Sequence, residues 1–254
     1  MPKKRKKRRR RGGLGRLLRP LSVVLAAVAV VAALTLFFKV ENIEVTGSSR
    51  YQASEIIEAS GVETGDNLVL LDRYRVSQRI YTSLPYVTDV RPKPKFPNTL
   101  EIEVTETRAA ASIQGAGGFW LISSDGKLLE AVDSVTAADY LQITGVQAEN
   151  PAVSSPLALP EDSPISPERL RALLDALAGQ EALNRTDVIN CGNSRELVLE
   201  YDGRFQVEIF YDADFDFKVT CLLSAVDKLE PNQTGILRMT MSDDYEVRFI
   251  PSAG

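Results

Sequence analysis

Residues 84–106 read LPYVTDVRPKPKFPNTLEIEVTE, and this stretch decides the fold of the segment around it. Two runs with strand-like alternation flank a turn at Phe96–Thr99. In the second run Leu100, Ile102 and Val104 alternate with polar residues, which is typical of a strand with one packed face and one wet face. The stretch therefore predicts two strands that pair across the turn, the second of them packed on one side.

The residues upstream of this hairpin predict one strand and two helices. A short strand is expected over 39–47, and a first helix over 54–60 is followed by a glycine that suits the position after a helix. A second helix over 72–84 has its apolar residues four apart on one face and ends before a proline. The order from residue 39 to 108 is therefore β-α-α-β-β.

Five motifs in this segment are VENIEVTG (40–47), SGV (60–62), GDNL (65–68), LPYV (84–87) and FPNTLEIEVTE (96–106). In these motifs and their spacing the chain resembles the POTRA domain of the FtsQ/DivIB bacterial cell-division proteins. The resemblance runs through residues 39–108 and implies a POTRA domain over this segment.

Pro92 and Pro94 depart from the family's usual alternation of apolar and basic residues. Proline has no N–H to donate to a ladder and is tolerated in sheets at an edge or a bulge. The segment 87–95 is therefore expected to be an edge strand, and its prolines with Lys93 and Lys95 should prevent a partner strand from adding there. The alternative is a local irregular loop.

Nine consecutive basic residues, Lys3–Arg11, precede an uncharged apolar stretch at Pro20–Phe38. As a helix this stretch would be about 28 Å long, close to the ~30 Å hydrocarbon core of a bilayer. A cleaved signal peptide is the alternative, because Ala27–Ala29 resembles a small-residue cleavage motif, but the apolar run continues beyond it. We expect an uncleaved transmembrane helix at 20–38, with the basic tail 1–19 in the cytoplasm and the rest of the chain across the membrane.

The charge of the remaining chain argues against a nucleic-acid partner. Eleven of the 30 Lys and Arg residues lie in residues 1–19, which leaves 19 basic against 34 acidic side chains and a net charge of about −15. A nucleic-acid-binding domain would carry positive charge on its folded body. The chain has no histidine, which removes His-activated nucleophiles and His-based zinc sites. Cys191 and Cys221 fit no metal motif, and both a disulfide and two buried thiols stay open.

The segment 109–250 predicts a mixed β-sheet with two packed helices, so the fold class is α+β. Hairpins are expected at the turns 124–126, 202–203 and 242–244, and helices at 166–179 and 214–229. The proline-rich segment 147–167 is expected to be an extended surface loop, and 251–254 a C-terminal tail. This arrangement resembles the second domain of the same family, the β-domain, less specifically than the POTRA segment does.

No catalytic constellation can be assembled from the sequence, which has no Gly-rich phosphate loop, Ser-x-x-Lys motif or activated-cysteine pattern. We therefore expect neither an enzyme nor a cofactor, a metal or a small-molecule substrate. The family resemblance implies instead a non-catalytic scaffold of the bacterial divisome at the septum. It would bind FtsB/DivIC-type and FtsL-type proteins outside the membrane and support septal peptidoglycan synthesis.

The resemblance also implies that partners bind at the edge formed by the last strand, supported by the preceding helix. Carried to this chain by position, the implied partner-binding residues are Tyr245, Glu246, Val247, Arg248, Phe249, Ile250, Leu222 and Val226. A terminal strand offers its backbone to an added strand. The alternative function is a membrane-anchored POTRA docking component of a transport or secretion system.

Overall fold

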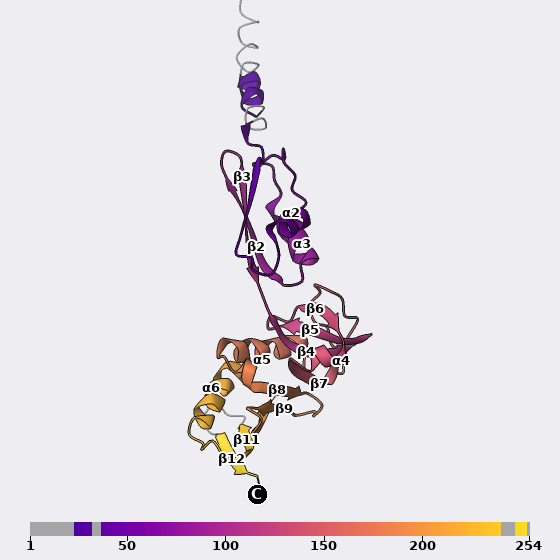
Figure 1. The fold of residues 1–254 in the computed structure, drawn as a ribbon, viewed down its shortest axis with the longest axis vertical. Helices are drawn as coiled ribbons and strands as arrows, with labels where there is room; N and C mark the ends of the chain where they lie inside the picture. Colours follow the sequence, from indigo (N-terminus) through magenta and orange to yellow (C-terminus); the bar gives the residue numbers. More distant parts are fainter. Residues whose placement is uncertain (1–22, 32–36, 240–246, 253–254) are drawn as a thin grey trace, which may run out of the picture. The chain divides into compact units, whose positions relative to one another are not determined.

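A computed structural model of the 254-residue chain describes residues 23–31, 37–239 and 247–252 (Figure 1). By its internal contacts the chain divides into two compact units. The first runs to Ser77 and includes Val90–Val104, and the second contains Gln78–Asp89 and the residues from Thr105 onward. This division cuts through the segment assigned to the POTRA domain, so the domain boundaries expected from the sequence stay predictions.

The expected membrane span, 20–38, falls only partly within the described residues. Residues 23–31 are helical and their apolar side chains are exposed. In the ranges that the structure describes, no helix combines the length and the apolarity needed to cross a membrane. The basic tail at 1–19 lies outside these ranges. The span and the topology derived from it therefore stay predictions.

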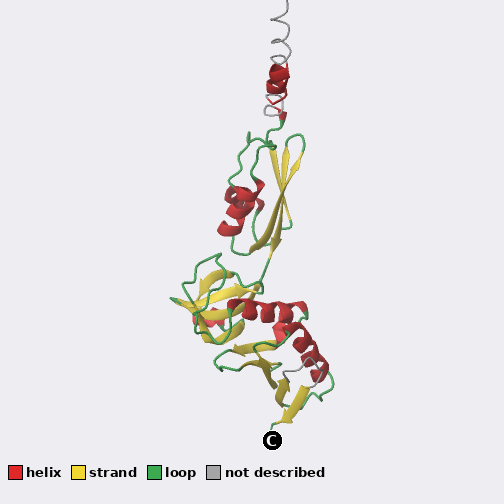
Figure 2. Ribbon diagram, turned by 180° about the vertical axis from the view of Figure 1, so that it is seen from behind, coloured by secondary structure: helices red, strands yellow, loops and turns green. Residues whose placement is uncertain are grey.

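The sequence-predicted order β-α-α-β-β is confirmed. The elements are β1 (Asn42–Thr46), α2 (Ala53–Ser60), α3 (Arg73–Ser83), β2 (Val87–Lys95) and β3 (Thr99–Glu106). The strands form a three-stranded sheet in the order β1-β3-β2, with β1 parallel to β3, and the two helices lie on one side of it (Figures 1 and 2). Leu100, Ile102 and Val104 are all buried, as their alternation predicts.

Strand β2 lies at an edge of this sheet, which confirms the edge-strand prediction and excludes the irregular loop. Pro92 is buried and Pro94 half-buried on one face, while Lys93 is exposed on the other. There Lys93 forms an ion pair with Glu103 of the neighbouring strand. The expectation that this edge resists strand addition is not tested by the fold and stays a prediction.

The second unit contains a nine-stranded mixed sheet in the order β12-β11-β10-β9-β8-β7-β4-β5-β6. Its strands are β4 (Ala109–Gly115), β5 (Gly118–Ser123), β6 (Leu128–Val132), β7 (Leu141–Ala148), β8 (Thr186–Asn190), β9 (Glu196–Tyr201), β10 (Phe205–Phe210), β11 (Gly235–Met239) and β12 (Val247–Pro251). Its helices are α4 (Ser134–Ala137), α5 (Pro167–Gly179), the 3-10 helix η1 (Leu183–Arg185) and α6 (Phe215–Val226). The α+β class and the mixed sheet with two long helices are confirmed, whereas β4, β7, β8, α4 and η1 were not expected.

The hairpins expected at 124–126 and 202–203 are present as the antiparallel pairs β5–β6 and β9–β10. Strands β11 and β12 also pair antiparallel, whereas the turn expected at 242–244 lies outside the described residues. Between β9 and β10 both Asp202 (φ 60°) and Gly203 (φ 61°) adopt left-handed conformations. Two such residues in a row suit the right-handed twist of the flanking strands, and Asp-Gly is a preferred pair for this turn. The local signal was therefore sufficient to place β9 beside β10.

The prediction of a surface loop over 147–167 is partly wrong. The segment between β7 and α5 is irregular, but Leu157, Leu159 and Ile165 are buried within the core of the second unit. The prolines prevent regular structure there, yet the apolar side chains between them are still driven out of water. The segment therefore covers part of the sheet instead of lying free of it.

Both cysteines are thiols in the core of the second unit, and no disulfide joins them. Burial raises the pKa of Cys191 to about 12. A thiol with so high a pKa contributes little thiolate at neutral pH, and the thiolate is the reactive form. The alternative of two buried thiols, which the sequence left open, is therefore the one observed.

A lysine is buried in the second unit beside the end of α3. Lys127 is 2% exposed, and its Nζ donates hydrogen bonds to the carbonyl oxygens of Tyr81 at 3.0 Å and Val87 at 2.8 Å. The same nitrogen lies 3.6 Å from the centre of the Tyr81 ring. Burial lowers the pKa of Lys127 to about 8, against a smaller raising effect of the Asp125 carboxylate.

Because the pKa of Lys127 is lowered in the folded chain, the free energy of unfolding should depend on pH. Between pH 8 and its ordinary pKa of 10.5 the unfolded chain keeps the proton that the folded chain has released. The free energy of unfolding should therefore rise with pH across this window, and the cost of the buried charge should be fully present below pH 8. Urea unfolding at pH 7.5 and 9.5 should show a larger gain for the unaltered chain than for Lys127→Met. An equal or smaller gain would contradict the prediction.

Candidate functional site

The candidate site is the end of the nine-stranded sheet formed by β12. Among the described residues β12 pairs with β11 and with no other strand. The register joins Val247 to Met239 and Pro251 to Gly235. The last strand of the chain is therefore an edge strand within the described part of the sheet, where the sequence placed it.

The hydrogen bonding of β12 fixes which of its backbone groups point away from β11. The N–H of Ser252 donates to the carbonyl of Thr234 at 3.0 Å, which makes these two a hydrogen-bonded pair. In an antiparallel ladder such pairs alternate with pairs that point their N–H and C=O groups outward. Counting back from Ser252 along the register, Ile250 and Arg248 bond to β11, whereas Val247, Phe249 and Pro251 direct their backbone groups to the open edge.

Pro251 fits this assignment. Proline is tolerated on an edge strand where its missing N–H faces away from the neighbouring strand. Pro251 occupies an outward-pointing position, so the β11–β12 ladder loses no donor there. The open edge therefore offers the N–H and C=O groups of Val247 and Phe249, and only a carbonyl at Pro251.

The side chains of β12 alternate between two environments. Val247 and Phe249 are half-buried and pack against the core, and the Phe249 ring meets the Phe205 ring edge-on at 6.2 Å between centroids. Arg248 is exposed and Ile250 is half-buried. Val247 and Phe249 therefore share one face of the strand, and Arg248 and Ile250 share the other. Tyr245 and Glu246, also expected at the site, lie outside the described residues.

Leu222 and Val226 of α6 do not reach the surface. They are 0% and 4% exposed and belong to the core of the second unit. In this structure they could support β12 from beneath, but they offer no area to an incoming partner. The side of the helix that carries the sequence-predicted apolar stripe is thus turned inward.

A groove of about 450 Å³ lies where α6 meets the last two strands. It is lined by Cys221, Ser224, Ala225, Lys228, Leu229, Leu237, Val247 and Phe249. The helix contributes positions 221, 224 and 225, which share one helical face, and Lys228 and Leu229 follow its end. This face adjoins the Leu222 and Val226 stripe, and sequence reasoning missed it because its residues are small or polar.

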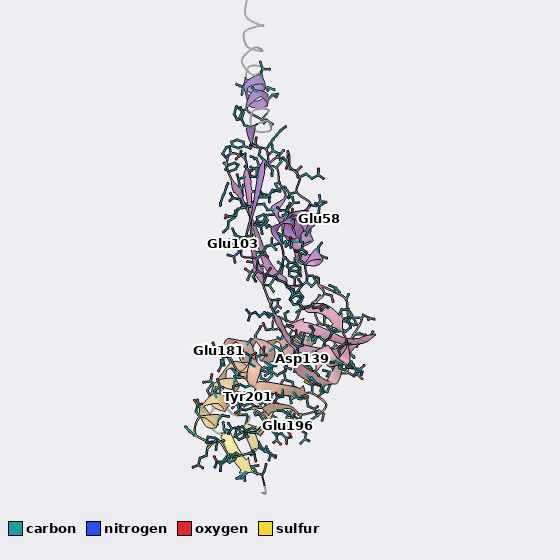
Figure 3. All side chains as sticks on the ribbon, viewed as in Figure 1. Glu58, Glu103, Asp139, Glu181, Glu196 and Tyr201 are labelled. Carbon is teal, nitrogen blue, oxygen red and sulfur yellow. The ribbon has the colours of Figure 1, made fainter. Side chains whose placement is uncertain are left out.

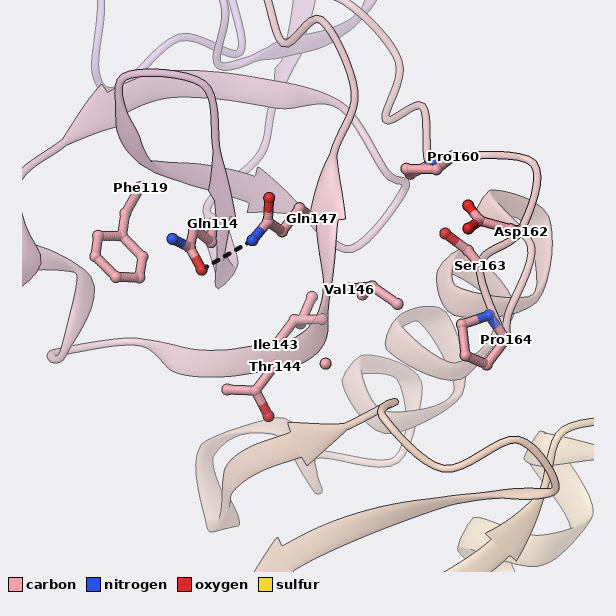
Figure 4. Close-up of a pocket in the computed structure, with 11 residues that line it drawn as sticks. Gln114, Phe119, Ile143, Thr144, Val146, Gln147, Pro160, Asp162, Ser163 and Pro164 are labelled. Carbon is pink, nitrogen blue, oxygen red and sulfur yellow. Dashed lines mark hydrogen bonds between the residues drawn. The ribbon is translucent and has the colours of Figure 1, made fainter.

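A second cavity, of about 500 Å³, is drawn in Figure 4. Gln114 and Gln147 lie on one side, where the Gln147 amide donates to Gln114 at 3.4 Å, and Asp162 and Ser163 of the irregular segment lie on the other. Asp162 is the one ionisable side chain among the lining residues of this cavity. The Ser163 hydroxyl lies beside this carboxylate, but the lining residues include no basic side chain that would complete a catalytic group with them.

Acidic side chains do not converge on a metal site in the described ranges, where no three His, Cys, Asp or Glu residues are grouped for a metal ion. Asp139 and Glu181 lie in two different turns and Glu196 lies in β9, and Figure 3 shows the three labels apart from one another. The edge of β12 with its groove is therefore the feature whose geometry suggests a specific interaction.

The comparisons with known proteins agree on one family. The family model for the POTRA domain of the FtsQ type matches residues 38–107. The cell division protein FtsQ of Corynebacterium glutamicum is 33% identical over 131 residues, 52% of this chain and 58% of that protein. The cell division protein DivIB of Clostridium tetani is 25% identical over 183 residues, 72% of this chain and 68% of that protein.

A further relative, the cell division protein DivIB of Clostridium acetobutylicum, is 28% identical over 114 residues. This match covers 45% of either chain. The matched parts thus span between 45% and 68% of the lengths of these three relatives. The family model is confined to 38–107, whereas the longest of these three matches covers 72% of the chain.

Proposed function

This chain belongs to the FtsQ/DivIB family of bacterial cell-division proteins, and we propose that it acts as a non-catalytic scaffold of the divisome. In this proposal residues 20–38 anchor the chain in the cell membrane, and the remainder faces outward at the division septum. It would hold FtsB/DivIC-type and FtsL-type proteins there in support of septal peptidoglycan synthesis.

The observation that carries the proposal is the open edge of β12. Val247 and Phe249 point their backbone N–H and C=O groups outward, which gives a partner segment two donors and two acceptors to pair with. An extended peptide that adds to a sheet edge gains affinity from such main-chain bonds and specificity from side-chain pockets. The edge of β12 provides the main-chain hydrogen-bonding groups. The adjoining groove provides a pocket for a side chain of the partner.

The groove suggests what kind of side chain the partner presents. Its apolar walls include Leu229, Leu237 and Phe249, which suit an aliphatic or aromatic residue of an added strand. Lys228 at the groove and Arg248 on the opposite face of β12 are both exposed. A partner segment that alternates apolar residues with acidic ones would match both features.

Substituting the groove tests the side-chain half of this proposal. Leu229→Asp places a carboxylate among apolar walls, where it must be desolvated when the partner binds. We expect at least about tenfold weaker capture of an FtsB/DivIC-type segment, or ~1.4 kcal/mol, in a binding titration. Glu230→Ala, at the next and exposed position, is the matched control and should bind normally. Equal affinities for Leu229→Asp and the unaltered chain would contradict a role for the groove.

Localisation tests the proposed function itself. A fluorescent fusion of the whole chain should accumulate at midcell in dividing cells, and depletion of the chain should block septation. A uniform envelope distribution with normal septation after depletion would contradict the scaffold proposal. That outcome would favour a transport or secretion role instead.

A further inference from the structure

Besides Tyr74 and the helix at 23–31, four large apolar side chains of the first unit are exposed outside its core. Phe37 is 76% exposed, Leu70 71%, Phe96 59% and Val69 47%. Isolated exposed apolar residues are ordinary on protein surfaces, whereas several gathered in one place mark an interaction site. These four side chains indicate an interaction site if they lie close together in the fold.

Three backbone segments distant in sequence meet at one end of the first unit and carry these residues. The Phe38 and Phe96 rings meet edge-on at 5.0 Å between centroids, which joins the chain before β1 to the β2–β3 turn. The N–H of Leu68 donates to the carbonyl of Phe38 at 2.9 Å, and Lys39 forms a β-bridge with Asn67. Figure 2 shows the β2–β3 turn at the end of the sheet where β1 begins.

The loop that presents Val69 and Leu70 is held in place. The side-chain oxygen of Asn67 accepts the N–H of Val69 at 2.9 Å and of Leu70 at 3.0 Å. This Asn therefore caps the turn and fixes both apolar residues outside the core. A fixed apolar surface loses less conformational entropy on binding than a loose one would.

These four residues lie beside the end of the apolar stretch 20–38, and this position indicates a membrane surface as their partner. Phe37 is the penultimate residue of the apolar stretch 20–38, whose described helical part, 23–31, also exposes its apolar side chains. If 20–38 spans the bilayer, Phe37 and Phe38 lie at the membrane–water boundary. Phe96, one ring contact from Phe38, and the loop bonded to Phe38 must then lie at nearly the same depth.

We propose that this end of the first unit, the rim formed by Phe37, Val69, Leu70 and Phe96, is inserted into the headgroup region of the membrane. The inference rests on the proposed anchor at 20–38. Aromatic and aliphatic residues flanked by basic ones favour this region, and exposed Lys39 and Arg73 adjoin the rim in sequence. The rim would fix the orientation of the first unit on the bilayer instead of leaving it tethered at one point.

Spin labels on the full chain test this inference, because the two native cysteines are buried in the core. Single substitutions Leu70→Cys, Phe96→Cys, Phe37→Cys and Val135→Cys introduce accessible thiols at four exposed positions. The labelled chains are reconstituted in vesicles of phosphatidylethanolamine and phosphatidylglycerol. Collision of each nitroxide with oxygen, which concentrates in lipid, is then compared with collision with a water-soluble nickel chelate.

We expect severalfold higher ratios of oxygen to chelate collisions at positions 37, 70 and 96 than at position 135, which lies in the second unit. High accessibility to oxygen at 37 alone would overturn the rim and leave the anchor intact. Accessibility to the chelate at all four positions would overturn both the rim and the anchor. Equal ratios of oxygen to chelate collisions at positions 70, 96 and 135 would contradict insertion of the rim into the membrane.

Discussion

Replacing Val247 by proline should weaken capture of an FtsB/DivIC-type segment between tenfold and a hundredfold while both units stay folded. The N–H of Val247 points to the open edge, so proline removes a donor offered to the partner and leaves the β11–β12 ladder intact. The lost hydrogen bond and the partner carbonyl left without a donor together cost ~1.4–2.8 kcal/mol. The pyrrolidine ring also obstructs the approach of a second strand.

Two substitutions at the next residue are the matched controls. Arg248→Pro removes an N–H that bonds to β11, so β12 should detach and the unfolding transition should shift as well as binding. Arg248→Ala keeps the backbone N–H and removes only the exposed side chain that an acidic partner residue would meet, so it should weaken binding by less than about fivefold. Binding by Val247→Pro at unaltered strength, in a chain with normal circular dichroism, would exclude strand addition at this edge.

Replacing Gly235 by alanine should detach β12 from the sheet. A Cβ at this position would lie 2.2 Å from the carbonyl oxygen of Ile250 and 3.0 Å from the Cα of Pro251. Both atoms belong to the backbone of β12, which cannot rotate away as a side chain could. Forcing extra volume into a packed site costs about 1–3 kcal/mol or more, and here the strain acts on the β11–β12 pairing itself.

The measurement for Gly235→Ala is amide exchange at Arg248 and Ile250, which should become fast as partner capture is lost. Gly179→Ala is the matched control, because a Cβ there meets nothing within 4 Å. It lies at the end of α5 and should leave exchange in β12 unchanged. Slow exchange at Arg248 and Ile250 in Gly235→Ala would show that the strand pair tolerates the methyl group and would contradict the prediction.

The parts of the fold that the sequence predicts correctly are those with local signals. Alternation in 99–106 and the Asp202–Gly203 turn each specify a strand pair between neighbours in the chain. Strands β7 and β8 were missed because β7 pairs in parallel with β4 and with β8, both of them far away in sequence. Parallel pairing leaves no turn between the partners to signal it.

The candidate site was predictable in part for the same reason. The last strand and its two faces follow from the alternation of Val247, Arg248 and Phe249. Which backbone groups of β12 point outward depends on its register with β11, and this register cannot be predicted from the residue types in the strand. The apolar stripe of α6 at Leu222 and Val226 drew attention to the packed face, although the groove is lined by the less apolar face beside it.

The most direct test of the account is amide hydrogen exchange at β12 with and without an FtsB/DivIC-type segment bound to the full chain. Arg248 and Ile250 should exchange slowly in both states, because their N–H groups already bond to β11. Val247 and Phe249 should exchange rapidly in the unbound chain and become protected when the segment binds. Binding without added protection at Val247 and Phe249 would contradict strand addition to β12 as the means by which this protein holds its partner.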